Sequence, residues 1–412
     1  MIEIFFYLFL VLCAGLIIRI INKPELIFEY PYFIAGIFLV FLVPQAIIIK
    51  NQPTLVPTEA IAPLFAMCFL CLGMAVLGYF FAPVIKLGKS MEVELDSRKL
   101  KTIAIIYMVV GYGFYLLVRN EVEGNSYTTQ WSGPATIFIQ FAQIINIAFP
   151  ILFYLALTKR SSINIFLAIA ASLPTLHAIL INGRRESTAL FLMTIALTIF
   201  FKYRITPPRF IIVAMLVITI LIIPATGEYR ELAKKEGPFK AITSLDLQQS
   251  FRKFYTEGEL LELGVAAHVI DSYMFHERYG YGAGYWDQMV FRYIPGQLVG
   301  SDVKKALQLD QRRLTFKDGY KMYTGLTLTG VGDSFIQFGF LGSLFFFFLG
   351  GVFRNLWIKS TQGNYLLIQI LYMMCFIQAM LSVTHATVNF LPGIFFSLLC
   401  LWFAAKFAKA NG

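Results

Sequence analysis

The chain has 412 residues, of which 58% are apolar and 14% charged, whereas soluble domains carry about 25% charged residues. The formal net charge of +10 does not indicate nucleic-acid binding, because nearly half of the 34 Lys and Arg residues flank apolar runs and the longest polar segment is almost neutral. The composition therefore excludes a water-soluble domain and predicts a protein that lies in a lipid bilayer.

Eleven apolar stretches recur along the chain, most of them near the roughly 20 residues that cross about 30 Å of hydrocarbon as a helix. They are continuously apolar, without the alternation of a membrane-barrel strand, so they predict helices. They cover residues 3–22, 31–49, 60–81, 102–118, 135–157, 163–181, 187–201, 210–225, 326–350, 364–384 and 388–405, the seventh and eighth being short. The predicted fold class is an all-α polytopic membrane protein with about 11 transmembrane helices.

The predicted organisation has three parts: eight helices in residues 1–225, one large loop in 226–325, and three helices in 326–412. With the N terminus outside, sixteen Lys and Arg residues fall in inside connections and four in short outside ones. Because short cytoplasmic loops are enriched in Lys and Arg, this distribution predicts a cytoplasmic C terminus and an extracytoplasmic large loop. Glu3, with no basic residue before it, is the wrong flank for a signal peptide.

A short outer hairpin, Asn182-Gly-Arg-Arg-Glu186, joins the sixth and seventh stretches on the face where arginine should be rare. An arginine deep in a bilayer costs about 2.5–3.5 kcal/mol on insertion scales, so such residues pair, reach the interface or line a polar cavity. Two adjacent fork-shaped donors suit a phosphate or diphosphate. Arg184 and Arg185 are therefore candidate diphosphate ligands, and the alternative is a pair of interfacial arginines balanced by Glu186.

The large loop contains its own predicted elements. Apolar spacing predicts an amphipathic helix over 257–278, and Ser301 as a cap predicts a short helix over 303–309. The glycine-aromatic stretch 279–286 between them predicts a loop. Four aromatic side chains in and after it suit either sugar stacking or the membrane interface: Tyr281, Tyr285, Trp286 and Tyr293.

Other ionisable residues share the outer face by predicted topology although they are distant in sequence: Arg230, Arg292, Asp333 and His385. His268 and Asp271 lie a helical turn apart, a spacing that would let the carboxylate orient the imidazole. His268 and His385 are candidate proton-transfer groups, with a purely structural role as the alternative for each.

No metal and no cofactor are predicted. The sequence has no Walker A, HExxH or Asp-x-Asp motif, and the nearest approach to a metal site is the pair of acidic alternations at 92–96 and 121–123. The five cysteines all fall inside apolar stretches, so they predict no disulfide framework. The Cys68-x-x-Cys71 pair has no histidine or carboxylate nearby, which favours packing over redox or metal chemistry.

Four short motifs follow one another along the chain. They are the hairpin Gly183-Arg184-Arg185, the pair Tyr229-Arg230 leading into the large loop, Gly282-Ala-Gly-Tyr-Trp286 followed by Arg292-Tyr-Ile-Pro295, and the stretch 332–342 that re-enters the membrane. Motifs of these kinds in this order resemble those of the Wzy-type O-antigen polymerases and their capsular relatives. Asp333 departs from the pattern, because glutamate is expected at this position.

The resemblance implies a GT-C-like metal-independent glycosyltransferase in a bacterial inner membrane. Such an enzyme transfers a growing glycan from undecaprenyl pyrophosphate to the terminal sugar of a new lipid-linked repeat unit, and a chain-length regulator is a possible partner. It further implies that Arg184, Arg185, Arg230 and Arg292 bind the pyrophosphate while Asp333 or a histidine activates the acceptor hydroxyl. Alternatives that stay open are an O-antigen ligase, a flippase or transporter for the same lipid-linked sugar, and a non-catalytic membrane scaffold.

Overall fold

The structure is a computed structural model of the chain and describes residues 2–83, 89–124, 134–181, 183–252, 261–309, 316–322, 326–363 and 365–410. Within these ranges the regular structure is helical, and the β contact found there is an isolated bridge between Leu95 and Lys409. Ten helical segments in the described ranges are long and apolar enough to cross a membrane. The predicted all-α polytopic membrane fold is confirmed.

The first half of the chain forms a series of long helices with short connections. Their bounds are α1 Ile2–Asn22, α2 Tyr30–Ile37, the π-turn η2 Phe38–Leu42, α3 Val43–Asn51, α4 Thr58–Phe81, α5 Ser97–Gly124, α6 Pro134–Ala142, α7 Ile145–Lys159, α8 Ser162–Leu180 and α9 Arg185–Tyr203. The second predicted stretch is thus one span made of α2, η2 and α3. Pro44 near the start of α3 lacks a backbone N–H, which accounts for the local π-turn.

The second half begins with the long helix α10 and ends with two full spans. The bounds are α10 Arg209–Glu236, α11 Pro238–Ser244, α12 Leu247–Arg252, α13 Glu262–His276, α14 Ala283–Tyr293, α15 Gly296–Val299, α16 Ser301–Ala306, α17 Thr329–Phe338, the 3-10 turn η7 Gly339–Ser343, α18 Leu344–Gln362, α19 Leu366–Thr384, the 3-10 turn η8 Thr387–Asn389 and α20 Phe390–Ala408.

Two predicted spans differ from the structure. The stretch 210–225 corresponds to the apolar part Arg209–Ile222 of α10, which is shorter than a full span and continues without a break as a polar helix to Glu236. The stretch 326–350 is divided: α17 ends where Gly339 takes φ +57, and α18 then runs on to Gln362. A positive φ at glycine has no Cβ penalty, which allows this break between two helices.

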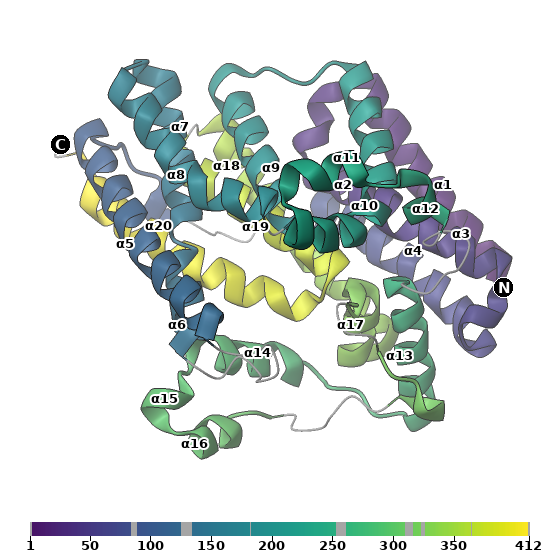
Figure 1. Cartoon of the computed structure of the whole chain (residues 1–412). Helices are drawn as coiled ribbons and strands as arrows, with labels where there is room; N and C mark the ends of the chain where they lie inside the picture. The colour runs from purple at the N-terminus through teal and green to yellow at the C-terminus, as the bar shows by residue number, and fades with distance from the viewer. Residues whose placement is uncertain are drawn as a thin grey trace.

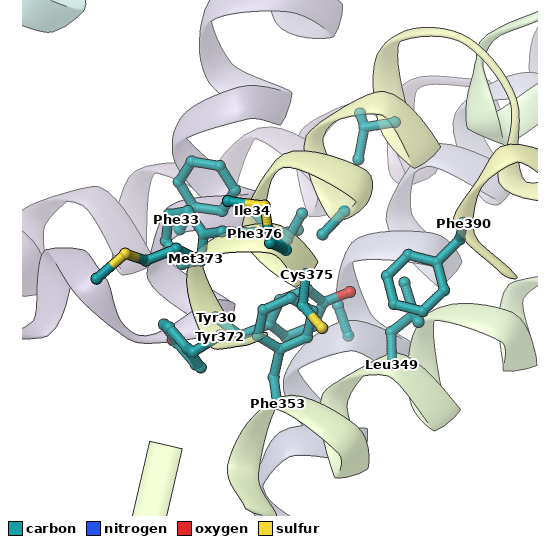
Figure 2. Packing of buried hydrophobic residues seen from close by; sticks show 14 of the residues in the cluster. Tyr30, Phe33, Ile34, Leu349, Phe353, Tyr372, Met373, Cys375, Phe376 and Phe390 are labelled. Atoms are coloured by element: carbon teal, nitrogen blue, oxygen red, sulfur yellow. The ribbon is translucent and has the colours of Figure 1, made fainter. Parts of the chain in front are cut away.

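Helix packing centres on α19, which has the largest buried share of the candidate spans in the described ranges. In Figure 2 the rings of Tyr30 and Phe33 from α2 meet Phe353 from α18 and Phe376 from α19. Tyr30 stacks on Phe353 with ring centroids 4.3 Å apart, and Phe33 on Phe376 at 3.7 Å. These buried rings fix the relative positions of three spans.

The helices α4 and α18 pack with their backbones in contact. A Cβ atom added to Gly78 would lie 2.0 Å from the carbonyl oxygen of Phe347, and one added to Gly350 would lie 2.4 Å from the nitrogen of Tyr79. Small residues at a helix crossing allow this approach, which is a common way to join helices in a membrane.

The short helices of the predicted large loop lie in two places: α14, α15 and α16 are at the lower edge of the bundle in Figure 1, whereas α11 and α12 pack beside α10. The helix predicted over 257–278 is found as Glu262–His276, and its first two-thirds are buried rather than amphipathic because α13 packs on α17 and α4. The predicted start of that helix at 257–260 lies outside the described residues. The helix predicted over 303–309 begins earlier, at Ser301.

Candidate functional site

The helix α14 is held against the spanning helices by side chains on one of its faces. The Tyr285 hydroxyl lies 3.0 Å from Thr387 Oγ1, and Gln288 Nε2 donates to Asn389 Oδ1 at 2.9 Å. One turn later, the Tyr293 hydroxyl donates to the carbonyl oxygen of Pro392. Residues three, four and seven apart share a helix face, so these bonds aim Arg292 toward the bundle as well.

The glycine-aromatic stretch connects α14 to the end of α17. Gly280 N donates to the carbonyl oxygen of Ile336 and Tyr281 N to that of Gln337, both at 2.8 Å, while Gly284 N donates to Gln337 Oε1 at 3.2 Å. A Cβ added to Gly284 would lie 2.4 Å from Gln337 Nε2, so glycine permits this close approach. The prediction of a loop over all of 279–286 was wrong in its second half, because α14 already begins at Ala283.

Arg292 lies where three elements meet. Its Nε donates to Gln140 Oε1 on α6 at 2.8 Å. Glu186, exposed in the first turn of α9, interacts electrostatically with both Arg184 and Arg292. Burial lowers the pKa of Arg292, and the neighbouring Tyr293 and Glu186 act in the opposite direction. Two of the four predicted arginines, Arg184 and Arg292, thus act electrostatically on one carboxylate, although no ion pair within 4.0 Å joins either of them to Glu186 in the described part of the chain.

The other two predicted arginines are described only by their backbone. Arg185 is the first residue of α9, directly after Arg184. Arg230 follows Tyr229 on α10, and the Tyr229 hydroxyl donates to the carbonyl oxygen of Leu180 at the end of α8 at 2.9 Å. The backbone at 229–230 thus lies beside the turn that carries Arg184, while the side chains of Arg185 and Arg230 lie outside the described part of the structure.

Asp333 is buried, with 3% of its surface exposed. It accepts hydrogen bonds from Thr387 Oγ1 and, at 3.1 Å, from Val388 N. The carboxylate is covered in this conformation, so contact with an acceptor hydroxyl, which the predicted role as a general base requires, would need a local rearrangement. Instead, Asp333 fixes η8, and through Thr387 and Tyr285 it is linked to α14.

The two histidines lie in different surroundings. The His268 ring stacks on Tyr320 with centroids 3.8 Å apart, and its predicted partner Asp271 forms an ion pair with Lys317 at 3.5 Å. Both contacts join α13 to the segment 316–322 and not to the arginines. His385 is exposed at the end of α19, with Nδ1 2.9 Å from Thr384 Oγ1, and it lies two residues before Thr387.

The four candidate sugar-stacking rings divide into two pairs. Tyr285 and Tyr293 are part-buried and bonded to the spanning helices, and burial raises the pKa of the Tyr293 hydroxyl to about 12. Tyr281 is 72% exposed and Trp286 49% exposed, with the indole N–H of Trp286 donating to the carbonyl oxygen of Leu307. Only Tyr281 and Trp286 present a ring surface that a sugar could cover.

Sequence reasoning missed two residues that bond to candidate site residues, Gln140 with Arg292 and Thr387 with Asp333, and it considered Glu186 only as a counter-charge to the arginine pair. Gln140 gave a usable signal, because a polar residue inside an apolar stretch is a candidate functional residue. Among the described residues no three His, Cys, Asp or Glu side chains are grouped closely enough to hold a metal ion.

Comparison with known proteins adds no assignment. No family model, curated protein or solved structure matches this chain, so the resemblance to the Wzy-type polymerases rests on the sequence motifs themselves.

Proposed function

We propose that this chain is a glycosyltransferase of a bacterial inner membrane that polymerises undecaprenyl-pyrophosphate-linked oligosaccharide repeat units on the outer face. The observation that carries the proposal is the hydrogen bond at 2.8 Å that holds Arg292 of α14 on Gln140 of α6, and Glu186 is in addition coupled electrostatically to both Arg292 and Arg184, which lie 108 positions apart in the sequence. A pair of guanidinium groups from separate elements suits a ligand with two adjacent phosphates.

In the proposed reaction the acceptor hydroxyl oxygen attacks the anomeric carbon of the donor glycan. The new glycosidic bond forms as the bond from that carbon to the diphosphate oxygen breaks, and the hydroxyl proton passes to a base. Negative charge grows on the departing diphosphate, and arginines fixed in place stabilise this charge better than mobile water does. The lipid tail stays in the bilayer while the sugars reach the exposed rings of Tyr281 and Trp286.

The base in this proposal is an accessible group near η8 or the arginines. His385 is exposed beside η8, and Glu186 is exposed beside both arginines. Either group could accept a proton without rearrangement, in contrast to the buried Asp333. These two residues, ahead of His268 on α13, are the first to test by substitution.

The experiment is glycan profiling of a deletion strain that carries single variants. We expect Arg292→Lys and Arg184→Ala to shorten the glycan, because loss of charge-assisted bonds worth about 1.5–3 kcal/mol slows transfer by about tenfold or more. Arg278→Lys is the matched control, since Arg278 is exposed on the same polar segment and should leave chain length unchanged. Normal long chains in both test variants would contradict the proposal.

The profile also separates the alternatives. Loss of a polymerase leaves single repeat units attached to the lipid core, and loss of a ligase leaves none. Loss of a flippase leaves the lipid-linked unit on the inner leaflet, where an external glycosidase cannot reach it in intact cells.

A further inference from the structure

A buried amide next to Arg292 has a donor that the fold does not use. Gln140 on α6 is 6% exposed, and its Oε1 accepts the hydrogen bond from Arg292 Nε at 2.8 Å. Its Nε2 has no hydrogen-bond partner among the described residues. Buried polar side chains are nearly always bonded, so each exception asks for an explanation.

The orientation of this amide follows from its partner. The oxygen and nitrogen of a glutamine side chain are often interchangeable by shape, and their assignment depends on the hydrogen-bond network. A guanidinium group only donates, so the atom of Gln140 that faces Arg292 must be the oxygen. The unpaired atom is therefore the NH₂ group, with two donors and no acceptor.

The neighbourhood selects the chemistry of the missing partner. The bond to Gln140 occupies Nε of Arg292 and leaves the two Nη nitrogens as donors, and the Arg184 guanidinium acts electrostatically on the same Glu186 carboxylate as Arg292. A group that meets these donors must be rich in acceptors and negatively charged, as the oxygens of a phosphate are. A cation is excluded by charge, and a sugar hydroxyl would use fewer of the donors.

We propose that Gln140 is a direct ligand contact, whose amide donates to a phosphate oxygen of a lipid diphosphate beside the Nη groups of Arg292. One side chain then does two things: its carbonyl oxygen fixes the guanidinium plane, and its NH₂ group binds the ligand. The identity of the ligand rests on the proposed function, whereas the presence of an anion-oxygen contact at Gln140 rests on the orphan amide.

The test uses two substitutions that separate these effects. Gln140→Glu is nearly the same shape and keeps an acceptor for Arg292, but it replaces the NH₂ donors by a negative oxygen. Gln140→Leu removes both functions. If Gln140 only positioned Arg292, Gln140→Glu would bind an anion nearly as well as the original protein; if the amide contacts the ligand, Gln140→Glu should bind at least as weakly as Gln140→Leu.

The assay measures affinity of the purified full-length chain in lipid nanodiscs for farnesyl diphosphate at pH 8, with farnesol as the uncharged probe. We expect the dissociation constant for farnesyl diphosphate to rise about tenfold or more in both variants, because a charge-assisted bond is lost. Gln143→Glu is the control for added charge, since Gln143 is a half-buried glutamine one turn along and should change affinity less than about threefold. Size-exclusion profiles and circular dichroism establish that each variant is folded.

The outcomes are distinct for the two proposals. Affinity of Gln140→Glu equal to that of the original protein, or no binding of farnesyl diphosphate by the original protein, overturns the contact. Binding that depends on Gln140 together with normal glycans in the Arg184 and Arg292 variants keeps the contact and overturns the polymerase. Short glycans in the Arg184 and Arg292 variants, together with farnesyl diphosphate binding that does not depend on Gln140, keep the polymerase and overturn the contact.

Discussion

The hydroxyl of Thr387 links the buried Asp333 to the docked helix α14 through hydrogen bonds. The substitution Thr387→Val removes this hydroxyl with little change in the shape of the side chain. Thr387 is fully buried and its Oγ1 donates to Asp333 Oδ2. Its single hydrogen is thereby used, so the Tyr285 hydroxyl 3.0 Å away must be the donor in the second bond. The substitution deletes both bonds at once and leaves Asp333 with Val388 N.

The expected loss of stability follows from these two bonds. A hydrogen bond to a carboxylate contributes about 1.5–3 kcal/mol and a neutral one about 0.5–1.5 kcal/mol, so Thr387→Val should destabilise the protein by about 2–4 kcal/mol. Tyr285→Phe removes only the neutral bond and should lose about 1 kcal/mol. The Tyr285 bond needs the Thr387 oxygen, so Tyr285→Phe should cost almost nothing further once Thr387 is replaced by valine. The stability of the double variant should therefore lie within about 0.5 kcal/mol of that of Thr387→Val.

The assay is unfolding of the purified chain by SDS in mixed micelles, followed by circular dichroism, with the original protein, both single variants and the double variant side by side. Thr387→Val within about 0.5 kcal/mol of the original protein would refute the bonded chain from Asp333 to α14. Additive losses in the double variant would refute the argument that Tyr285 acts through Thr387.

Three further predictions follow from the fold and the orientation. Gly78→Ala should destabilise the protein by about 1–3 kcal/mol in the same SDS assay, because the new Cβ would lie 2.0 Å from the backbone oxygen of Phe347. Gly15 has open space around it, so the control Gly15→Ala should be neutral or stabilise the protein by up to about 1 kcal/mol. A membrane-impermeant maleimide should label Thr243→Cys in intact spheroplasts but Lys409→Cys only after permeabilisation. The five native cysteines are buried and give little background labelling. Labelling of both variants in intact spheroplasts, or the reverse pattern, would contradict an outside N terminus. Glycan elongation in membrane vesicles should persist in EDTA at its rate without chelator, and its loss, restored by added Mg²⁺ or Mn²⁺, would contradict a metal-independent transfer.

Local sequence properties predicted most of the spanning helices. Apolar runs of sufficient length must satisfy their backbone bonds internally in a bilayer, so hydropathy and helix formation are tied together. The same reasoning was less accurate at 326–350, where the backbone of Gly339 and the packing of Gly342 against Ser334 interrupt the helix. The same reasoning also predicted a loop where α14 in fact begins at Ala283, because a glycine-rich composition carries no information about the segment that the glycines approach.

The sequence by itself determined the membrane class of this protein, its pattern of spans and the residue types suited to an anion, since each of these depends on neighbours along the chain. Only the tertiary structure decided which of them meet: Arg292 and Gln140 are bonded across 152 positions, and Thr387 and Asp333 across 54. It also buried Asp333, used Tyr285 and Tyr293 for docking, and left Tyr281 and Trp286 exposed. These outcomes depend on how whole helices pack, because a hydrogen bond between distant segments forms only after the helices that carry them have been placed.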